Sequence, residues 1–248
     1  MKPPFRIHRT TKQRSETLPL HAHEEGQLTF AASGMVQIHT EAGVWMVPPQ
    51  LAAWVPAGVS HRLEALTDAE LWIVHLDCEA LGEWEGGGPL DRAFALRITP
   101  LLRALLDQAV AIDPMSRKAD LVARLMLHEL KAMEDAPTFL PLPISRVGKR
   151  VADLAVEDLH NRLSIDELAS RAATSVRTVT RLFPAETGLT LKAWRQRVRI
   201  VRAMGLLASG DPSAKVARDT GFASTAAFSC AFRQVTAMTP TAFMSRSA

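Results

Sequence analysis

A spaced repeat near the C-terminus constrains the fold of this chain more than any other feature. The segment FPAETGLTLKAW begins at Phe183, and FRQVTAMTPTAF begins 49 residues later at Phe232. Each copy opens and closes on an aromatic residue and carries a threonine and an alanine at matching positions. A period of this size indicates a duplicated structural unit.

The first copy predicts two short helices separated by a tight turn. Ser164 and Glu167 have the spacing of a capping box, so a helix is expected to begin at Ile165. Ser175 can cap a second helix, and Gly188 supplies a left-handed stop after it. This second helix would bury Val179, Leu182 and Phe183 and expose Arg177, Thr178 and Arg181. Because arginine pairs with guanine edges and with phosphate, the pattern predicts a helix-turn-helix that contacts DNA.

The second copy predicts the same motif with a less basic outer face. Asp211 would cap a helix whose first residue is Pro212, Gly221 would lie in the turn, and Ser224 would cap the next helix. The outer face of that helix would present Thr225, Ala226, Ser229, Cys230 and Arg233. Because it has one arginine, we expect this face to hold phosphates more than it reads bases.

One uninterrupted helical pattern, LKAWRQRVRIVRAMGLLAS, joins the two copies and carries Arg197, Arg199 and Arg202 besides the residues named below. Roughly 18 helical residues span about 27 Å, close to one duplex turn of about 34 Å. This rod can therefore hold both second helices in successive major grooves. The residues expected to contact DNA are Ser175, Arg177, Thr178, Arg181, Lys192, Arg195, Ser224, Thr225, Ser229 and Arg233.

Charge divides along the chain in the same way. The 248 residues carry a formal net charge of +3, which separates into −5 for residues 1–144 and +8 for residues 145–248. A basic part joined to an acidic part indicates that the C-terminal part meets a polyanion. The chain start lacks the apolar run of a signal peptide, no stretch is long enough to span a membrane, and Cys78 and Cys230 suit a reducing compartment. We therefore expect a cytoplasmic protein.

The N-terminal part changes from a strand pattern to a helical one. Up to about Asp77, the short runs LTFAAS, MVQIHT, VWMV, AAWV and LWIVHL predict a small β-sandwich or barrel. GEWEGGGP, at 82–89, indicates a flexible break. A helical period then runs from Asp91 to Met133, divided by Pro114. Its apolar stripe, which suits either packing on the barrel or a dimer seam, is Leu121, Val122, Leu125, Met126, Leu130 and Met133.

The proline-rich segment APTFLPLP, at 136–143, predicts a stiff linker. The expected fold is therefore α+β with two domains. Residues 1–134 would form a β-barrel with flanking helices, residues 135–147 the linker, and residues 148–248 an all-α domain with two helix-turn-helix units.

Histidines gather on the predicted strands. His21 and His23 are two residues apart, so on one strand both side chains would point to the same face, and Gln27 and His61 follow. Three imidazoles suit Zn, Fe, Ni or Cu, whereas the neutral amide of Gln27 is a poorer ligand than a carboxylate. Alternatively, the histidines hydrogen-bond a ligand or each other. His75, on a later strand, could line the same cavity, but we expect it to be a satisfied core residue. Trp45, Trp54 and Trp72 are also expected in the core.

Residues 163–246 resemble the two helix-turn-helix units of AraC-type transcription factors. The matching segments are SIDELA, SVRTVTRLF, ETGLTLKAWRQRVRIVRA, VARDTGF, AAFSCAF and MTP. HAHEEGQLTFAASG and PAGVSH resemble the two cupin motifs, which places His21, His23, Gln27 and His61 at the positions that hold a metal in metal cupins. The resemblance implies promoter binding, transcriptional control and a cupin-like sensory barrel. LPLP with Arg146, and WRQR, are similar to the branch that often controls a neighbouring transport gene.

Four residues depart from the pattern of this family. Pro184 stands where a polar residue is usual and is expected to kink the first reading helix near its end. Ala237 replaces a glycine, at a cost of roughly 1 kcal/mol if its φ stays positive. Thr236 replaces an aromatic residue and Cys230 an arginine, so the second unit is expected to be looser and to bind DNA more weakly.

These observations favour an effector-responsive transcriptional regulator and not an enzyme. Its expected partners are double-stranded promoter DNA, a small-molecule effector, RNA polymerase and a second copy of the chain. The alternative is a metal-dependent cupin enzyme with a DNA-binding tail, holding Zn, Ni or Fe in the barrel. A catalytic ion usually needs an acid or base nearby, however, and Glu24 and Glu25 are expected to point to solvent. A third possibility is a protein that binds nucleic acid without sequence preference, whose affinity would depend on salt but not on the sequence bound.

Overall fold

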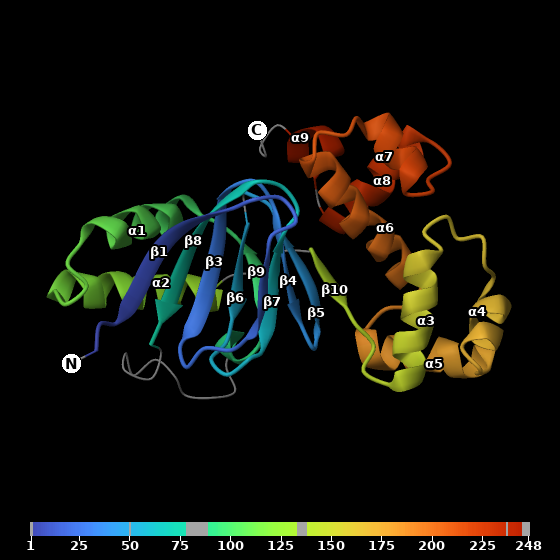
Figure 1. Ribbon diagram of the computed structural model, residues 1–248, viewed down its shortest axis with the longest axis horizontal. Coiled ribbons are helices and arrows are strands. Elements are labelled where there is room, and N and C mark those ends of the chain that lie inside the picture. Colours follow the sequence, from blue (N-terminus) through green and yellow to red (C-terminus); the bar gives the residue numbers. More distant parts are fainter. Residues whose placement is uncertain (1, 50, 78–88, 133–137, 237, 245–248) are drawn as a thin grey trace. The chain divides into compact units, whose positions relative to one another are not determined.

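The computed structural model describes residues 2–49, 51–77, 89–132, 138–236 and 238–244. Its contacts separate two compact units, one made mainly of residues 1–40 and 45–137 and the other of residues 41–44 and 138–245 (Figure 1). Cys78, Met133, Ala237 and nearly all of the predicted flexible break at 82–89 lie outside the described residues.

Antiparallel strands form the first unit, which confirms the predicted β-sandwich or barrel. One sheet has the order β1-β8-β3-β6-β9, and the other has the order β10-β5-β4-β7-β2. The strands are β1 (Phe5–Lys12), β2 (Thr17–His21), β3 (Gly26–Ser33), β4 (Val36–Thr40), β5 (Gly43–Val47), β6 (Leu51–Val55), β7 (His61–Ala65), β8 (Ala69–Leu76), β9 (Phe94–Arg97) and β10 (Phe139–Pro141). Of these, β10 and the first residues of β5 belong to the second unit.

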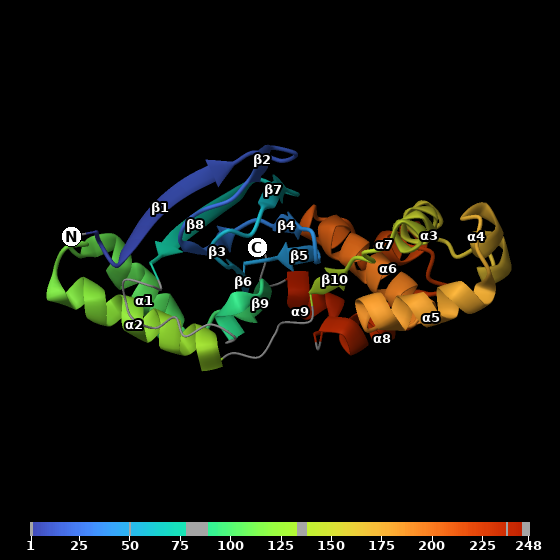
Figure 2. The same ribbon diagram turned by 90° about the horizontal axis from the view of Figure 1, so that it is seen from below.

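Alternation along β3 and β8 assigns the two faces of the first sheet. Leu28 pairs with Val74 and Phe30 with Trp72, and these side chains join the buried cluster of helices α1 (Pro100–Ala111) and α2 (Arg117–Ala132). Both helices lie against the sheet that contains β1, β8 and β3 (Figures 1 and 2). The intervening residues of β3 and β8 point to the opposite face, where the pocket described below is found. Trp45, Trp54 and Trp72 are buried, as predicted.

Residues 94–97 form a strand where the sequence pattern predicted helix. Phe94 to Leu96 are buried, and the strand pairs with β6 through Trp54 and Phe94. The apolar run Phe94–Leu96 comes shortly before Pro100 and a leucine-rich stretch, and three buried residues do not distinguish a strand from a helix, so the pattern concealed this boundary. The described stripe of α2 divides into a buried part and an exposed part: Val122, Met126 and Leu130 are buried, whereas Leu121 and Leu125 are exposed.

Helices form the second unit. They are α3 (Arg146–Glu157), α4 (Ile165–Arg171), α5 (Val176–Thr187), α6 (Leu191–Ala208), α7 (Ser213–Asp219), α8 (Thr225–Thr236) and α9 (Pro240–Met244). The repeated aromatics have the same role in both copies, since Phe183 meets Trp194 edge to face at 5.6 Å and Phe232 meets Phe243 at 5.5 Å. Both pairs are buried.

Part of the predicted linker is packed structure. Within the second unit, the indole of Trp194 donates to the Pro141 carbonyl at 2.6 Å, and Leu142 N–H donates to Ala42 at 3.0 Å. Ser145 then caps α3 by accepting from Gly148 N–H at 3.0 Å. Among the described residues, no helix has the length and apolarity needed to cross a membrane.

Candidate nucleic-acid interface and histidine pocket

The first reading helix, α5, begins and ends as the sequence predicts. Ser164 and Glu167 form the capping box of α4, and Ser175 accepts the Thr178 N–H at 3.1 Å at the start of α5. Gly188 closes α5 in the left-handed conformation at φ 69°. The helix continues through Pro184 to Thr187, so this proline does not end it. Arg177 and Arg181 are exposed, and Thr178 is half-buried.

The second reading helix, α8, is capped by Ser224, which accepts the Ala227 N–H at 3.1 Å. Thr225 and Arg233 are exposed, and Ser229 is half-buried. The preceding helix differs from the prediction by one residue: α7 begins at Ser213, Pro212 is the N-cap residue, and no side chain caps it. Asp211 instead accepts from the Lys215 ammonium at 2.9 Å. Figure 2 shows α5 and α8 on the same side of the helical unit.

Two threonines hold the ends of the reading helices in the same way. Thr187 and Thr236 donate to the carbonyl four residues earlier, at 2.7 and 2.8 Å. Each also accepts the N–H two residues later, at 3.2 Å. The buried hydroxyl of Thr236, which stands where the family has an aromatic residue, thus repeats every hydrogen bond of Thr187.

Arg195 on α6 faces the interior of the unit and not solvent. Its guanidinium bonds the Asp158 carboxylate at 2.7 Å and the Leu163 carbonyl at 2.9 Å, and both charged side chains are 11% exposed. Asp158 also accepts the N–H groups of Leu163 and Arg162, at 2.7 and 3.0 Å. The prediction that Arg195 contacts DNA is corrected on this geometry, because both terminal nitrogens of its guanidinium bond within the unit and its Nε is buried, without a partner among the described residues.

Arg197 and Arg199 also bond within the unit. Arg197 donates to the Phe139 carbonyl at 3.2 Å, and Arg199 donates to the Thr220 carbonyl at 2.7 Å while its guanidinium lies 3.6 Å from the ring centre of Phe222. Burial lowers the pKa of both guanidinium groups. Residues two apart on a helix lie about 200° apart, so the sequence already indicated that Arg197 and Arg199 could not both face one duplex. Lys192 and Arg202 are exposed.

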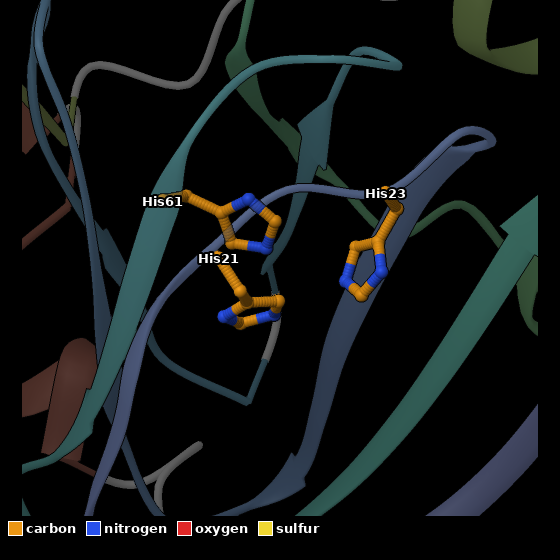
Figure 3. A group of neighbouring side chains, drawn as sticks. All are labelled: His21, His23 and His61. Atoms are coloured by element: carbon orange, nitrogen blue, oxygen red, sulfur yellow. The ribbon is translucent and has the colours of Figure 1, made fainter.

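Three histidines converge in the first unit (Figure 3). Ring centroids are 4.7 Å apart for His21 and His23, 4.5 Å for His21 and His61, and 5.3 Å for His23 and His61. Each offers a nitrogen within 4.8 Å of the other two. The predicted placement of His21 and His23 on one strand is wrong, because β2 ends at His21 and His23 lies in the following loop. The two side chains still meet.

Hydrogen bonds orient the imidazoles. The Nδ1 atoms of His21 and His61 lie 2.7 and 3.0 Å from the carbonyls of Pro19 and Val59, which assigns the proton to Nδ1 and leaves Nε2 as an acceptor. Among the residues that the structure describes, the buried Nε2 atoms of His23 and His61 have no hydrogen-bond partner. Burial lowers the pKa of both rings, so they are neutral at neutral pH.

The histidines line a small pocket of about 100 Å³. His75 also lines it, with its ring 4.5 Å from that of His23, and burial lowers the pKa of His75 to about 4. Its Nδ1 is buried and unpaired within the described part of the chain, so the prediction of a satisfied core residue is wrong. Gln27 is buried, and its amide donates to Thr29 at 2.9 Å. The remaining lining residues are His8, Leu18, Leu63 and Ile73.

The two acids next to this pocket differ from each other. Glu24 is exposed, as predicted, but Glu25 is only 9% exposed and was expected in solvent. Glu25 forms ion pairs with Lys2 at 2.9 Å and Arg6 at 3.0 Å. A hydrogen bond from Lys2 holds the pKa of Glu25 below its ordinary value. The Glu25 carboxylate is therefore paired with cations on β1 and at the chain start.

The two units together define a class of protein: a pair of helix-turn-helix motifs joined by one helix, in the same chain as a β-sheet unit with an internal pocket. Residues 2–130 match the model of the AraC-like ligand binding domain, and residues 168–246 match that of a helix-turn-helix domain. The chain belongs to the AraC family of transcriptional regulators.

Known proteins resemble the whole chain or its DNA-binding part. The HTH-type transcriptional regulator NimR of Escherichia coli is 29% identical over 248 residues, which is 98% of this chain and 87% of the relative. The structure of ToxT from Vibrio cholerae O395 is 12% identical with a TM-score of 0.42 and covers 99% of this chain and 98% of that one. The DNA-binding domain of AdpA, solved with a target DNA, is 33% identical with a TM-score of 0.36 and covers 38% of this chain and 86% of that one.

Proposed function

We propose that this regulator reads its operator mainly through α5 and anchors itself through α8. The observation that supports this division is the difference between two reading helices that both have a serine N-cap: α5 exposes Arg177 and Arg181, whereas α8 exposes the single Arg233. Serine caps leave the N-terminal ends of both helices open to phosphate. The proposed DNA contacts are Ser175, Arg177, Thr178, Arg181, Lys192, Ser224, Thr225, Ser229 and Arg233.

Binding to an operator selected from random DNA tests this division. Arg181→Ala should weaken specific binding by about 1–3 kcal/mol and relax the preference at one base position. Arg233→Ala should weaken binding to all sequences alike and reduce the salt slope by about one. If Arg181→Ala bound every sequence with the affinity of the unaltered chain, α5 would not be the reading helix.

The histidine pocket is proposed as the sensory site. Neutral imidazoles with free Nε2 atoms accept hydrogen bonds or coordinate a cation, and they have no charge with which to hold an anion. A volume of about 100 Å³ admits a molecule of a few heavy atoms, or an ion with its water ligands. The pocket therefore suits a small hydrogen-bond donor or a divalent metal.

A metal effector is favoured by the donor set. His21, His23 and His61 would hold the ion, and the carbonyls that fix the Nδ1 protons of His21 and His61 are the usual outer partners of metal-bound histidines. Bound there, an ion would crosslink the β2–β3 loop to β7. No carboxylate is found among the described residues that line the pocket, so a regulatory ion fits better than the alternative of a catalytic one.

Metal analysis with a matched variant tests the sensory site. Zn²⁺, Ni²⁺ and Fe²⁺ would be titrated into chelator-treated protein, with thermal stability and operator affinity as readouts. One equivalent should raise the melting temperature, and the effect should fade below about pH 6 as protons compete for the imidazoles. His61→Ala should abolish the shift, whereas His128→Ala, on α2, should not. A shift that persists in His61→Ala would place the ion elsewhere.

A second copy of the chain is the proposed partner of α2. Leu121 and Leu125 are 53% and 47% exposed and lie one helical turn apart. Exposed apolar rows of this kind mark association surfaces. Sedimentation should show a dimer that dissociates more readily in Leu121→Glu, and unchanged association would reject this surface. A regulator that works on chromosomal DNA is placed in the cytoplasm.

A further inference from the structure

We infer that residues 41–44, which form the turn between β4 and β5, are positioning residues through which the state of the histidine pocket reaches the reading helices. This inference rests on the proposed function, since it takes the pocket as the sensory site. The turn would act through the strands and helices that it holds, and not by touching an effector or a base.

One rung of the second sheet leads from the pocket to this turn. His61 on β7 is the register partner of His21 on β2 and, on its other side, of Thr40 on β4. Two of the pocket histidines and the last residue of β4 therefore lie side by side on adjacent strands. Thr40 is buried, and because packed interiors contain few voids, a shift of the His61 backbone should move Thr40 with it.

The chain leaves the first unit directly after this rung. Residues up to 40 belong to the first unit, residues 41–44 to the second, and the chain returns to the first unit at residue 45. Strand β5 therefore begins in one unit and continues in the other. The turn is thus part of the compact DNA-binding unit, although both strands that it joins run into the sheet that carries His21 and His61.

Within the second unit, the turn packs on β10. The Ala42 carbonyl accepts the Leu142 N–H at 3.0 Å. A Cβ on Gly43 would overlap the Leu140 carbonyl and the ring of Phe139. The turn can approach β10 this closely because residue 43 has no side chain.

Strand β10 in turn holds α6, the helix that joins the two helix-turn-helix motifs (Figure 2). The Phe139 carbonyl accepts from Arg197 at 3.2 Å, and the Pro141 carbonyl accepts from the indole of Trp194 at 2.6 Å. Leu140, between these two residues, is buried in the same apolar cluster as residues of α5. A displacement of β10 should therefore displace α6 and the first reading helix.

Helix α6 would convert such a displacement into a change at the DNA. Arg195 bonds the segment before α4, and Arg199 bonds the second turn, so α6 holds both motifs. A duplex accepts both reading helices only when they are spaced by roughly one turn, about 34 Å. Helix shifts of about 1–2 Å are a usual element of regulatory transitions, and a shift of α6 would change operator affinity.

The test measures how far zinc changes the operator affinity of the full chain. A Gly-Gly insertion between Ala42 and Gly43 lengthens the turn without removing a side chain. The matched control has the same insertion between Thr67 and Asp68, in the turn between β7 and β8, which lies in the first unit. Operator affinity is measured by fluorescence anisotropy with and without saturating Zn²⁺, and zinc affinity by isothermal titration calorimetry.

The expected result is a loss of the zinc effect in the lengthened turn alone. Zinc should change the operator affinity of the unaltered chain and of the control by about fivefold or more, as is usual for coupled sites. In the chain lengthened after Ala42, the change should fall below about twofold at an unchanged zinc affinity. A merely structural role would alter operator affinity equally with and without zinc. Gly43→Ala, which forces the turn away from β10, should lose the zinc effect in the same way.

An undiminished zinc effect in both turn variants would overturn the inference. His61→Ala separates the inference from the proposed metal site, because this substitution alters the pocket in the absence of any ion. Its effect on operator affinity should disappear when the turn is lengthened. If no zinc binds, the proposed metal site is rejected, and the double-mutant cycle of His61→Ala with the insertion still judges the turn. Additive effects, or no effect of His61→Ala in either chain, would reject it.

Discussion

The turns of the two helix-turn-helix units repeat one hydrogen-bond pattern on different sequences. Thr174 N–H donates to Ala169 at 2.9 Å in the first turn, and Phe222 N–H donates to Ala217 at 2.8 Å in the second, 48 residues later. The reading helices that follow repeat at 49 residues, because Ala223 is an additional residue before the serine cap. The backbone bonds thus preserve the turn while the sequence tolerates an insertion.

The left-handed residue of each turn shows a second difference. It is Ala173 at φ 52° in the first unit and Gly221 at φ 73° in the second. A Cβ on Gly221 would lie 2.8 Å from His160 Cα and 2.9 Å from the Leu159 carbonyl. The second turn therefore excludes any side chain, whereas the exposed Ala173 keeps its methyl group at the cost of backbone strain.

Both helix-turn-helix motifs are held to α6 by arginines that lie one helical turn apart. Arg195 ties the segment before α4 through Asp158 and Leu163, and Arg199 ties the second turn through Thr220 and Phe222. The first tie is a nearly buried ion pair, and the second is a hydrogen bond with a stacked ring. Replacing Arg195 should therefore cost more stability than replacing Arg199.

The largest expected effect is on the first tie. Arg195→Met leaves the Asp158 carboxylate nearly buried without its cation, which should lower the free energy of unfolding of the helical unit by about 3–5 kcal/mol. Urea unfolding followed by helix circular dichroism would measure the loss. The matched control, Arg202→Met at an exposed position of the same helix, should change it by less than about 0.5 kcal/mol. Equal losses of unfolding free energy in the two variants would show that the ion pair between Arg195 and Asp158 does not stabilise the helical unit.

A smaller effect is expected in the second turn. Gly221→Ala forces a Cβ against the backbone of Leu159 and His160, so its cost should exceed the roughly 1–2 kcal/mol of a left-handed alanine. Gly188→Ala is the control, because Gly188 has φ 69° and open space around it, so only the conformational cost applies. Equal losses of stability in Gly221→Ala and Gly188→Ala would show that the close backbone contacts at Gly221 add no cost.

Acid should destabilise the helical unit through Asp158. Burial raises the pKa of this carboxyl, but the N–H groups of Leu163 and Arg162 and the Arg195 guanidinium outweigh burial and hold the pKa below its ordinary value. Its stabilising contribution is present above the unfolded pKa of about 3.9 and is lost as the pH falls below that value. In Asp158→Asn, the free energy of unfolding should fall less steeply as the pH is lowered through this range. A curve as steep as that of the unaltered chain would place the acid sensitivity in other carboxylates.

The smallest effect is a gain. Ala173→Gly removes the strain of a left-handed alanine and should stabilise the first unit by about 0.5–1 kcal/mol. Thermal unfolding would detect it as a small rise in melting temperature. A loss would mean that the methyl group of Ala173 contributes packing that outweighs its backbone strain.

Local signals explain what could be predicted for the DNA-binding unit. The capping box at Ser164, the serine caps at Ser175 and Ser224 and the stop at Gly188 each depend on neighbours within a few residues, so the sequence alone specifies them. The apolar period predicted the length of α6 for the same reason. The convergence of His21 with His23 was predicted from their spacing on one strand, but it is the loop after β2 that brings the two rings together.

Tertiary structure alone decided the direction of the charged groups. The sequence pattern predicts that Arg195 contacts DNA, but the fold brings the Asp158 carboxylate, 37 residues earlier, to 2.7 Å from its guanidinium. The pattern also predicts that Glu25 is exposed to solvent, but the fold pairs it with Arg6. His75 becomes a pocket residue because β8 pairs with β3 and places it opposite Gln27. A local pattern determines which backbone forms, but a charge takes its partner from whatever the fold brings near, and that partner is distant in the chain.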